Sequence, residues 1–204
     1  MIRTKLASSE SELTGIRLLQ SQNLRRNLSA TEAAEQGFLI AEYTQEYLRS
    51  MNAHRPAVIA LDGDQVVGYA LAAAKSVREG HPFLSALFDE IDRLHFGQEP
   101  LKDIDYVVVG QLCISKAYRS QGLVQKLYGL FRESLQPHHR YAITDIARAN
   151  TRSLQAHRRT GFQVIHSLDY GGQTWDVVLW DWATPAAGAK GISPPPHPHG
   201  APRT

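Results

Sequence analysis

Helix-capping residues stand ahead of apolar runs in the first quarter of the chain. Ser followed three positions later by Glu, the pattern of a capping box, occurs at Ser9–Glu12 and again at Ser29–Glu32. Thr44 precedes a third run, and Gly37 supplies a stop for the second. Since apolar residues recur there at roughly helical spacing, the pattern predicts a largely helical segment after one short strand.

The pattern then changes to that of strands. β-branched runs within residues 57–74 flank the turn Asp62–Asp64, whose glycine can take a positive φ, so two antiparallel strands are expected to meet there. An amphipathic stripe over residues 82–94, opened by a proline, predicts a helix. Residues 106–114 are too apolar for an exposed edge, which favours a central strand.

The second half alternates helices and strands. Apolar residues from Leu123 to Leu135 predict a helix, and Asn150 is placed to cap another helix that Gly161 ends. The remaining strands are expected at residues 141–146, 162–165 and 174–182. This order contains a strand–helix–strand crossover, so the predicted fold class is α/β (α+β), with a mixed central sheet flanked by helices.

Composition describes one domain followed by a tail. Hydrophobic residues make up 43% of the 204 residues and charged residues 21%, as in an ordinary soluble domain. Residues 184–204 are rich in Pro, Gly, Ala and His and cannot bury enough apolar surface to offset the entropy of ordering. We expect a single domain over residues 1–183, helical over 1–55 and sheet-bearing over 56–183, and then a flexible tail.

Charge, cysteine content and the start of the chain narrow the function classes. The formal net charge of +2 does not favour nucleic acid or a membrane surface as the main partner. Cys113 is the single cysteine, which excludes an intrachain disulfide and a thiolate metal cluster within one chain. The residues after Met1 lack an apolar stretch of signal-peptide or membrane-helix length. These features predict a cytoplasmic protein.

A polar turn joins the strand at residues 106–114 to the next helix. It consists of Arg119, Ser120, Gln121 and Gly122. A helix N-terminus has unpaired N–H groups and a partial positive charge, so it can hold a pyrophosphate. Gly122 would let the backbone approach closely, and Arg119 adds a planar cation that complements phosphate oxygens.

This turn resembles the acetyl-CoA loop of the GNAT acetyltransferases. That loop reads Arg or Gln, any two residues, Gly, any one residue, then Gly or Ala, directly after a central strand. Arg119 and Gly122 match, whereas Val124 stands where the family has a small residue. Arg-x-x-Gly alone is a weak signal, and its strand-to-helix context strengthens it.

A second series further along the chain also resembles the family. Asn150, Ser153 and Gly161–Phe162 agree with it in identity and spacing, and His157 occupies the position of the family's Tyr. The two series are separated by one predicted helix and one strand. Two matches in the right order are strong evidence for the resemblance, which covers the chain best over residues 57–182.

The resemblance implies an N-acetyltransferase. Its acyl donor would be acetyl-CoA, its acceptor a primary amine that attacks directly in a ternary complex, and it would need no metal. Residues 1–55 would shape the acceptor side and residues 56–183 would bind acetyl-CoA. Relatives that pair as dimers make a homodimer compatible with the sequence. The cofactor-binding residues implied are Leu112, Cys113, Ile114, Arg119, Ser120, Gln121, Gly122, Leu123, Val124, Asn150, Ser153 and His157.

Two residues are candidates for catalysis. His157, in the family's Tyr position, could protonate the leaving thiolate, since an imidazole near its ordinary pKa can donate a proton. Asp145 is the best placed base, because strand alternation puts it on the same face as Ile143. Asp105 and Glu42 are weaker candidates. The alternative for His157 is a half-exposed helix residue, and the alternative for Asp145 is a solvated or salt-bridged carboxylate.

Two other functions stay open. The loss of the family's Tyr motivates a non-catalytic acyl-CoA-binding or sensing module. The basic cluster Arg148, Arg152, Arg158 and Arg159 could be solvated, contact nucleotide phosphates, or bind nucleic acid, although no interleaved aromatic residues accompany it. The histidine pairs His138–His139 and His197–His199 do not form a closed metal-ligand set.

Overall fold

The computed structural model describes residues 1–183, without the side chains of residues 34–36. The tail predicted for residues 184–204 lies outside the described residues. In the part of the chain that is described, none of the helices has the length and apolar character needed to span a bilayer.

Seven strands form one mixed sheet in the order β1-β2-β3-β6-β7-β9-β8, which confirms the predicted fold class. Neighbouring strands are antiparallel except β6 and β7, which run parallel because a helix carries the chain between them. A separate ribbon pairs β4 with β5. The strands are β1 (Arg3–Leu6), β2 (Val58–Asp62), β3 (Gln65–Ala73), β4 (His95–Phe96), β5 (Glu99–Pro100), β6 (Tyr106–Ile114), β7 (Tyr141–Ala147), β8 (Gln163–Tyr170) and β9 (Gln173–Asp181).

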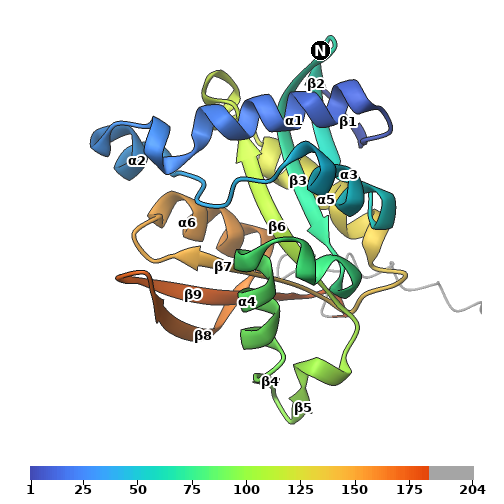
Figure 1. Ribbon diagram of the computed structural model, residues 1–204, viewed down its shortest axis with the longest axis vertical. Coiled ribbons are helices and arrows are strands. Elements are labelled where there is room, and N and C mark those ends of the chain that lie inside the picture. The colour runs from blue at the N-terminus through green and yellow to red at the C-terminus, as the bar shows by residue number, and fades with distance from the viewer. Residues whose placement is uncertain (184–204) are drawn as a thin grey trace, which may run out of the picture.

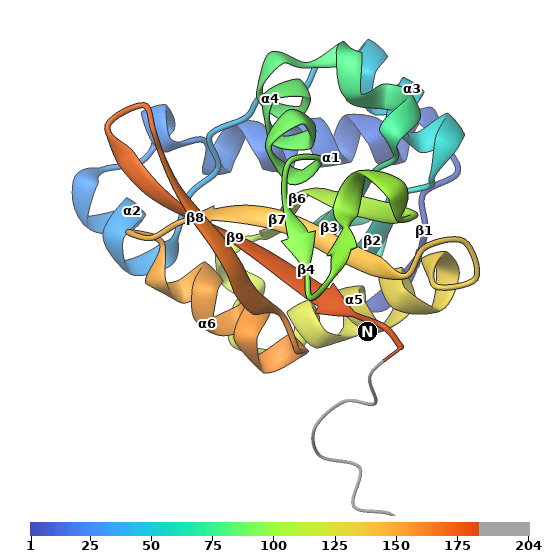
Figure 2. The same ribbon diagram turned by 90° about the horizontal axis from the view of Figure 1, so that it is seen from below.

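Helices cover both faces of the sheet (Figures 1 and 2). On one face α1, α3 and α4 pack around a core that includes Ile16, Met51 and Phe88. On the other face α5 and α6 enclose a second core around Phe131 and Leu154. The helices are α1 (Glu10–Asn23), α2 (Ala30–Gln36), α3 (Gln45–His54), α4 (Pro82–Ile91), α5 (Leu123–Leu135) and α6 (Thr151–Thr160), with short 3-10 turns at Arg25–Asn27, Lys75–Gly80, Leu101–Asp103 and Lys116–Tyr118.

The capping signals read from the sequence act as predicted. Ser9 accepts a hydrogen bond from the Glu12 amide, and the Glu12 carboxylate accepts one from the Ser9 amide, so the capping box of α1 is closed. The side chain of Ser29 caps α2, and that of Thr44 caps α3.

Helix α4 is shorter than the apolar stripe predicted. It ends at Ile91 instead of Leu94, because the amides of Arg93 and Leu94 bond only three residues back, to the Glu90 and Ile91 carbonyls. Phe96 then lies in β4, and Gly97, at φ 63°, turns the chain into β5. Leu94 and Phe96 still pack on the core that contains Phe88, so the apolar stripe continues beyond the end of the helix.

The parallel strands β6 and β7 separate halfway along their length. They pair over only three register positions, from Tyr106–Tyr141 to Val108–Ile143, although both strands continue beyond that point. At the same level the pairing of β6 with β3 shifts register, so that Gly110 is an extra residue in β6. The bulge bends β6 away from β7 and opens the sheet.

Three tryptophans at the end of the domain are buried. Trp180 and Trp182 belong to the core under α5 and α6, and Trp175 packs edge-on against Phe83. They therefore complete the core, and a homodimer contact stays a prediction.

Candidate active site

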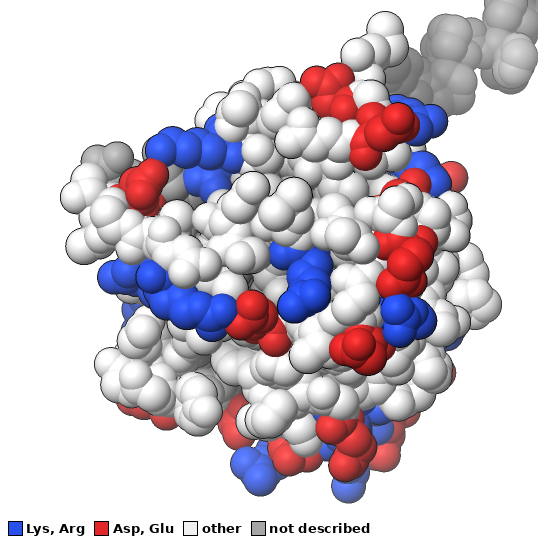
Figure 3. Space-filling model, turned by 45° about the horizontal axis from the view of Figure 1, so that its top comes forward, with Lys and Arg blue, Asp and Glu red and all other residues white. Residues whose placement is uncertain are grey.

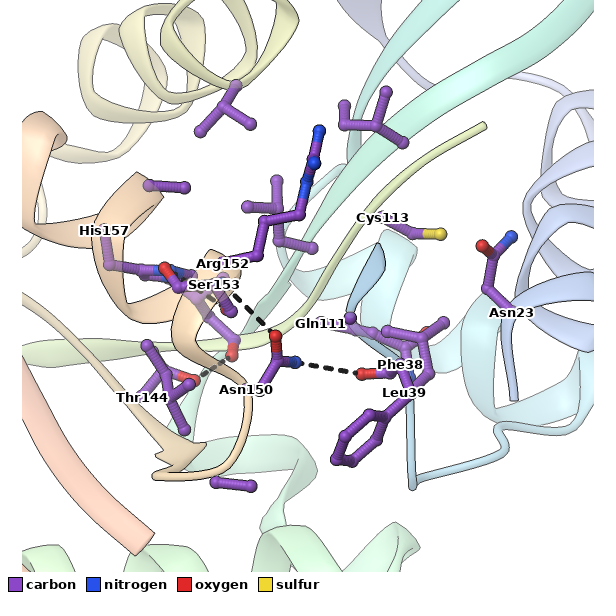
Figure 4. A pocket seen from close by; sticks show the side chains of 18 of the residues that line it. Asn23, Phe38, Leu39, Gln111, Cys113, Thr144, Asn150, Arg152, Ser153 and His157 are labelled. Carbon is purple, nitrogen blue, oxygen red and sulfur yellow. Dashed lines mark hydrogen bonds between the residues drawn. The ribbon is translucent and has the colours of Figure 1, made fainter. Parts of the chain in front are cut away.

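A cavity of about 700 Å³ lies where β6 and β7 separate. Its walls come from the second halves of β6 and β7, from the first turns of α5 and α6, and from the loop around Phe38. Figure 4 shows these elements converging on one space, with His157 and Ser153 on one side and Asn23 and Cys113 on the other. A cavity of this size is in the range of cofactor sites.

The turn before α5 has the conformation that an anion site requires. Ser120 and Gly122 both have positive φ, 63° and 75°, and Gly122 is the N-cap of α5 without a side-chain cap. No side chain therefore occupies the first amides of the helix, from Leu123 to Gln125, which line the cavity. The backbone donors predicted from the sequence thus face the space between the strands.

Arg119 lines the cavity but is also tied to the protein. Its Nε donates to the Ile114 carbonyl at 3.0 Å, and its Nη2 donates to Oδ1 of Asn23 at 2.6 Å. Burial lowers the pKa of Arg119 from its ordinary value. Arg119 therefore anchors the turn to the end of β6 and to α1, in addition to carrying charge.

Arg152 is the second cation at this turn. It lies in the first turn of α6, lines the cavity, and donates to the Ser120 hydroxyl at 3.2 Å. Arg159, two turns further along α6, lines the cavity as well, whereas Arg148 forms an ion pair with Asp176. The basic cluster read from the sequence is therefore divided between cavity and structural contacts.

Strand β6 supplies the wall predicted for the pantetheine arm. Leu112, Cys113 and Ile114 all line the cavity beyond the last pair with β7. On the side of β6 that faces β7, these residues have no strand partner, so the N–H and C=O groups that point to that side are available to a ligand. Burial raises the pKa of Cys113 to about 12, which keeps the thiol neutral and unreactive.

Asn150 joins α6 to the loop that closes the cavity. Its Oδ1 accepts from the Ser153 amide as the N-cap, and its Nδ2 donates to the Phe38 carbonyl at 3.4 Å (Figure 4). Gly37, at φ 76°, brings the loop so close that an added Cβ would lie 2.8 Å from Oδ1 of Asn150. The predicted residues Asn150 and Ser153 are thus in the cavity wall, with a structural role that fixes the loop.

His157 is buried, not half-exposed, and both of its ring nitrogens have protein partners. Nδ1 lies 2.8 Å from the Ser153 carbonyl, which can only accept, so Nδ1 carries the hydrogen. Nε2, 2.6 Å from Tyr128, then accepts from the phenol hydroxyl. Burial lowers the pKa of His157 to about 4. A neutral imidazole with this arrangement has no proton ready for a leaving group, so the geometry favours a structural histidine over a general acid.

Asp145 is the carboxylate at the inner end of the cavity. Every residue of β7 is buried except Asp145, which is partly exposed and lines the space. Among the described residues no Lys, Arg or His lies within ion-pair distance of it. Burial raises the pKa of Asp145 to about 7, which is the range of a proton acceptor at neutral pH. The salt-bridged alternative therefore does not apply within the described chain, and the role of Asp145 as base stays a prediction.

Three other residues proposed from the sequence are not part of the cavity wall. Glu42 pairs with Arg26 at the surface, and Asp105 is exposed at the start of β6. The side chain of Gln121 donates back to the Ala117 carbonyl, outside the cavity wall. Neither weaker base candidate lines the cavity.

The loop of residues 37–41 lines the cavity, which the local sequence did not reveal. It is held by Gln111, which donates to the Ala41 carbonyl at 2.8 Å and accepts from Gln20 and Tyr69 at 2.9 and 2.6 Å. A glutamine inside an otherwise apolar strand needs buried hydrogen-bond partners, so Gln111 itself was the sequence signal that another segment packs there. Which loop supplies them depends on long-range packing.

The charges on one face of the molecule and the placement of the described histidines do not indicate a nucleic-acid or metal site. Basic and acidic side chains are interspersed on the face seen in Figure 3. His139 accepts from Nε of Arg55, and among the described residues no group of three or more His, Cys, Asp or Glu could hold a metal ion.

Known proteins share this architecture. Residues 24–162 match the sequence pattern described as the acetyltransferase (GNAT) family. Because the match spans more than half of the chain, this protein belongs to the GNAT acetyltransferase family. No curated protein matches the chain significantly in sequence.

Solved structures agree on the fold at low sequence identity. A chain of the NatC complex bound to Gag peptide and CoA has a TM-score of 0.60 and 14% identity, covering 88% of this chain and 98% of its own. The protein yncA from Salmonella typhimurium, with its cofactor acetyl-CoA, has a TM-score of 0.59 and 13% identity, covering 92% and 97%. The ribosomal-protein-S18-alanine N-acetyltransferase from Escherichia coli has a TM-score of 0.59 and 8% identity, covering 92% and 98%.

Proposed function

We propose that this protein transfers an acetyl group from acetyl-CoA to a primary amine by direct attack in a ternary complex. The observation that carries the proposal is the separation of β6 from β7, which opens a cavity onto the unpaired amides at the start of α5. Family membership supports the acetyl donor. Two similar proteins support an amine acceptor: the NatC complex bound to Gag peptide and CoA, and the ribosomal-protein-S18-alanine N-acetyltransferase.

The pyrophosphate of acetyl-CoA would bind at the turn before α5. The amides of Leu123 and Val124 would donate to its oxygens, since valine keeps the backbone N–H that the family's smaller residue supplies. Arg152, beside Ser120, would add a cation at the edge of this site. From there the pantetheine arm would follow the open side of β6 past Ile114, Cys113 and Leu112.

The chemistry would take place near Asp145. The amine nitrogen attacks the thioester carbonyl, so that a C–N bond forms as the C–S bond breaks and its electron pair leaves on sulfur. Asp145 accepts the proton that the amine loses, and the thiolate takes a proton from water. Open peptide N–H groups of β6 would polarise the thioester carbonyl. His157 supports α6 from beneath and takes no part in proton transfer.

Calorimetry with acetyl-CoA, followed by CoA release with a panel of amines, tests the proposal. We expect acetyl-CoA to bind and CoA to appear only when an amine is present. Arg119→Glu should weaken binding at least about 10-fold, because it removes two anchoring hydrogen bonds and places a negative charge beside the phosphates. The control is Arg3→Glu, on the exposed edge strand β1, which should bind as the parent does. Absence of any heat would refute the proposal.

A non-catalytic acyl-CoA-binding module is the second candidate. The buried, neutral His157 at the family's Tyr position favours it, because the position supplies no acid. The same panel separates the two functions. Binding of acetyl-CoA without turnover on any amine would support the module.

A further inference from the structure

A second, smaller cavity adjoins the first. Its volume is about 250 Å³, and it lies between α4 and the end of β8. Phe83 and Asp145 line both cavities, so they form the shared wall. An amine held in the second cavity would therefore meet the inner end of the first beside Asp145.

The walls of this cavity are mostly apolar. Phe83 and Leu87 of α4 face Leu168 and Tyr170 of the β8–β9 hairpin across it. The elements are joined at the rim, where Nε2 of His166 lies 3.5 Å from Glu90. Such walls suit a hydrocarbon or aromatic body of small size, since drug-sized ligands occupy cavities of about 300 Å³ and more.

The charged groups of the cavity leave one carboxylate uncompensated. Glu90 is paired with Arg93 at 3.2 Å, and Asp89 is paired with Arg78. Of the three carboxylates that line this cavity, Asp145 is the one without a cationic partner among the described residues. An amino group fits next to it, whereas a carboxylate on the carbon that bears the amine would lie against a like charge.

We propose that the second cavity is the acceptor site and that the acceptor is a small primary amine on an apolar body, without a carboxylate next to the amine. This inference rests on the proposed acetyl transfer. The apolar body would lie between α4 and the hairpin, with its nitrogen at Asp145. The like charge of their carboxylate disfavours α-amino acids as acceptors, and the small volume of the cavity disfavours peptide N-termini.

Matched pairs of amines test the acceptor class. We expect 2-phenylethylamine and 3-methylbutylamine to release CoA with kcat/KM at least about 100-fold above phenylalanine and leucine, which differ from them by the carboxylate alone. Equal or better activity on the amino acids, on putrescine or on an Ala-initiated peptide overturns the inference but leaves acetyl transfer standing. Absence of acetyl-CoA binding in calorimetry removes both.

A substitution that fills the cavity tests its location. Ala86 is exposed on α4 and lines the second cavity but not the first, so Ala86→Phe should block the site without disturbing the core. We expect kcat/KM for 2-phenylethylamine to fall about 10-fold or more, with the Kd of acetyl-CoA unchanged. Ala53→Phe, at an exposed position of α3 outside both cavities, is the matched control and should change neither. Parent-like kcat/KM in Ala86→Phe overturns the inference.

Discussion

Tyr128 of α5 donates its hydroxyl hydrogen to Nε2 of His157 of α6, at 2.6 Å and fully inside the core. The bond joins the two helices that cover one face of the sheet. It also consumes the lone pair of His157 that a proton shuttle would need. The bond therefore supports a structural role for His157 at the family's Tyr position, in place of the acid role predicted from the sequence.

Removing this bond should reduce stability more than catalysis. Tyr128→Phe leaves Nε2 of His157 buried without a donor, at an expected cost of about 1–3 kcal/mol in the free energy of unfolding. His157→Ala adds a cavity and should cost about 2–5 kcal/mol. Urea denaturation measures both losses. With saturating substrates, folded His157→Ala should keep the kcat of the parent, and a fall in kcat of about 100-fold or more would restore His157 as an acid.

Stability should fall as the pH drops from about 6.5 toward 4. Burial lowers the pKa of His157 and of His139 to about 4 each, so the unfolded chain binds more protons in this range. Asp145 acts in the opposite direction, because its pKa of about 7 exceeds that of the unfolded chain. Asp145→Asn should therefore make the free energy of unfolding fall more steeply with decreasing pH, by at most about 1.4 kcal/mol per pH unit. Urea midpoints between pH 4.5 and 6.5 give the slopes, and equal slopes would contradict the raised pKa.

Local signals predicted the elements well because each depends on neighbouring residues. Ser9, Thr44 and Asn150 cap the helices that follow them, and residues 106–114 form the central strand. The predicted end of α4 was wrong because Leu94 and Phe96 continue the apolar stripe by packing on the core after the helix has ended.

The candidate site likewise contains features that the local sequence predicts and features that depend on distant residues. The turn around Gly122 and the cap at Asn150 follow from backbone requirements that a short stretch of sequence expresses. The burial of His157 depends on Tyr128, twenty-nine positions away, and no local pattern reveals it. The loop at Phe38 reaches the site through Asn150 across a separation of 112 residues.

Activity should rise with pH as Asp145 loses its proton. Asp145 can accept a proton only in its ionised form, and burial raises its pKa to about 7. We therefore expect kcat/KM to climb through about pH 7 and to level off above it. Asp145→Asn should lower kcat about 100-fold and remove this rise, while acetyl-CoA binding is kept. The pH profile of CoA release is the measurement. A profile of the same shape in Asp145→Asn would show that another group accepts the proton.

Two glycines of positive φ should respond differently to alanine. Gly122 has αL geometry at φ 75° and ψ 11°, and an added Cβ meets nothing within 4 Å, so Gly122→Ala should cost only about 1 kcal/mol of stability. Gly37 has φ 76° and ψ 171°, a region that is almost confined to glycine, and its Cβ would collide with Asn150. Gly37→Ala should therefore cost more, on the order of 2–3 kcal/mol.

Ligand binding should show the reverse order for the same two substitutions. A methyl group at residue 122 stands where the pyrophosphate approaches the first amides of α5, so Gly122→Ala should weaken acetyl-CoA binding about 10-fold or more, despite its small effect on folding. Gly37→Ala displaces the loop at Phe38 at the far wall, and should change the Kd less. Thermal unfolding and calorimetry on both variants separate the two effects. If Gly122→Ala binds acetyl-CoA as tightly as the parent, the phosphates do not lie at this turn, because no ligand could approach those amides closely without meeting the added carbon.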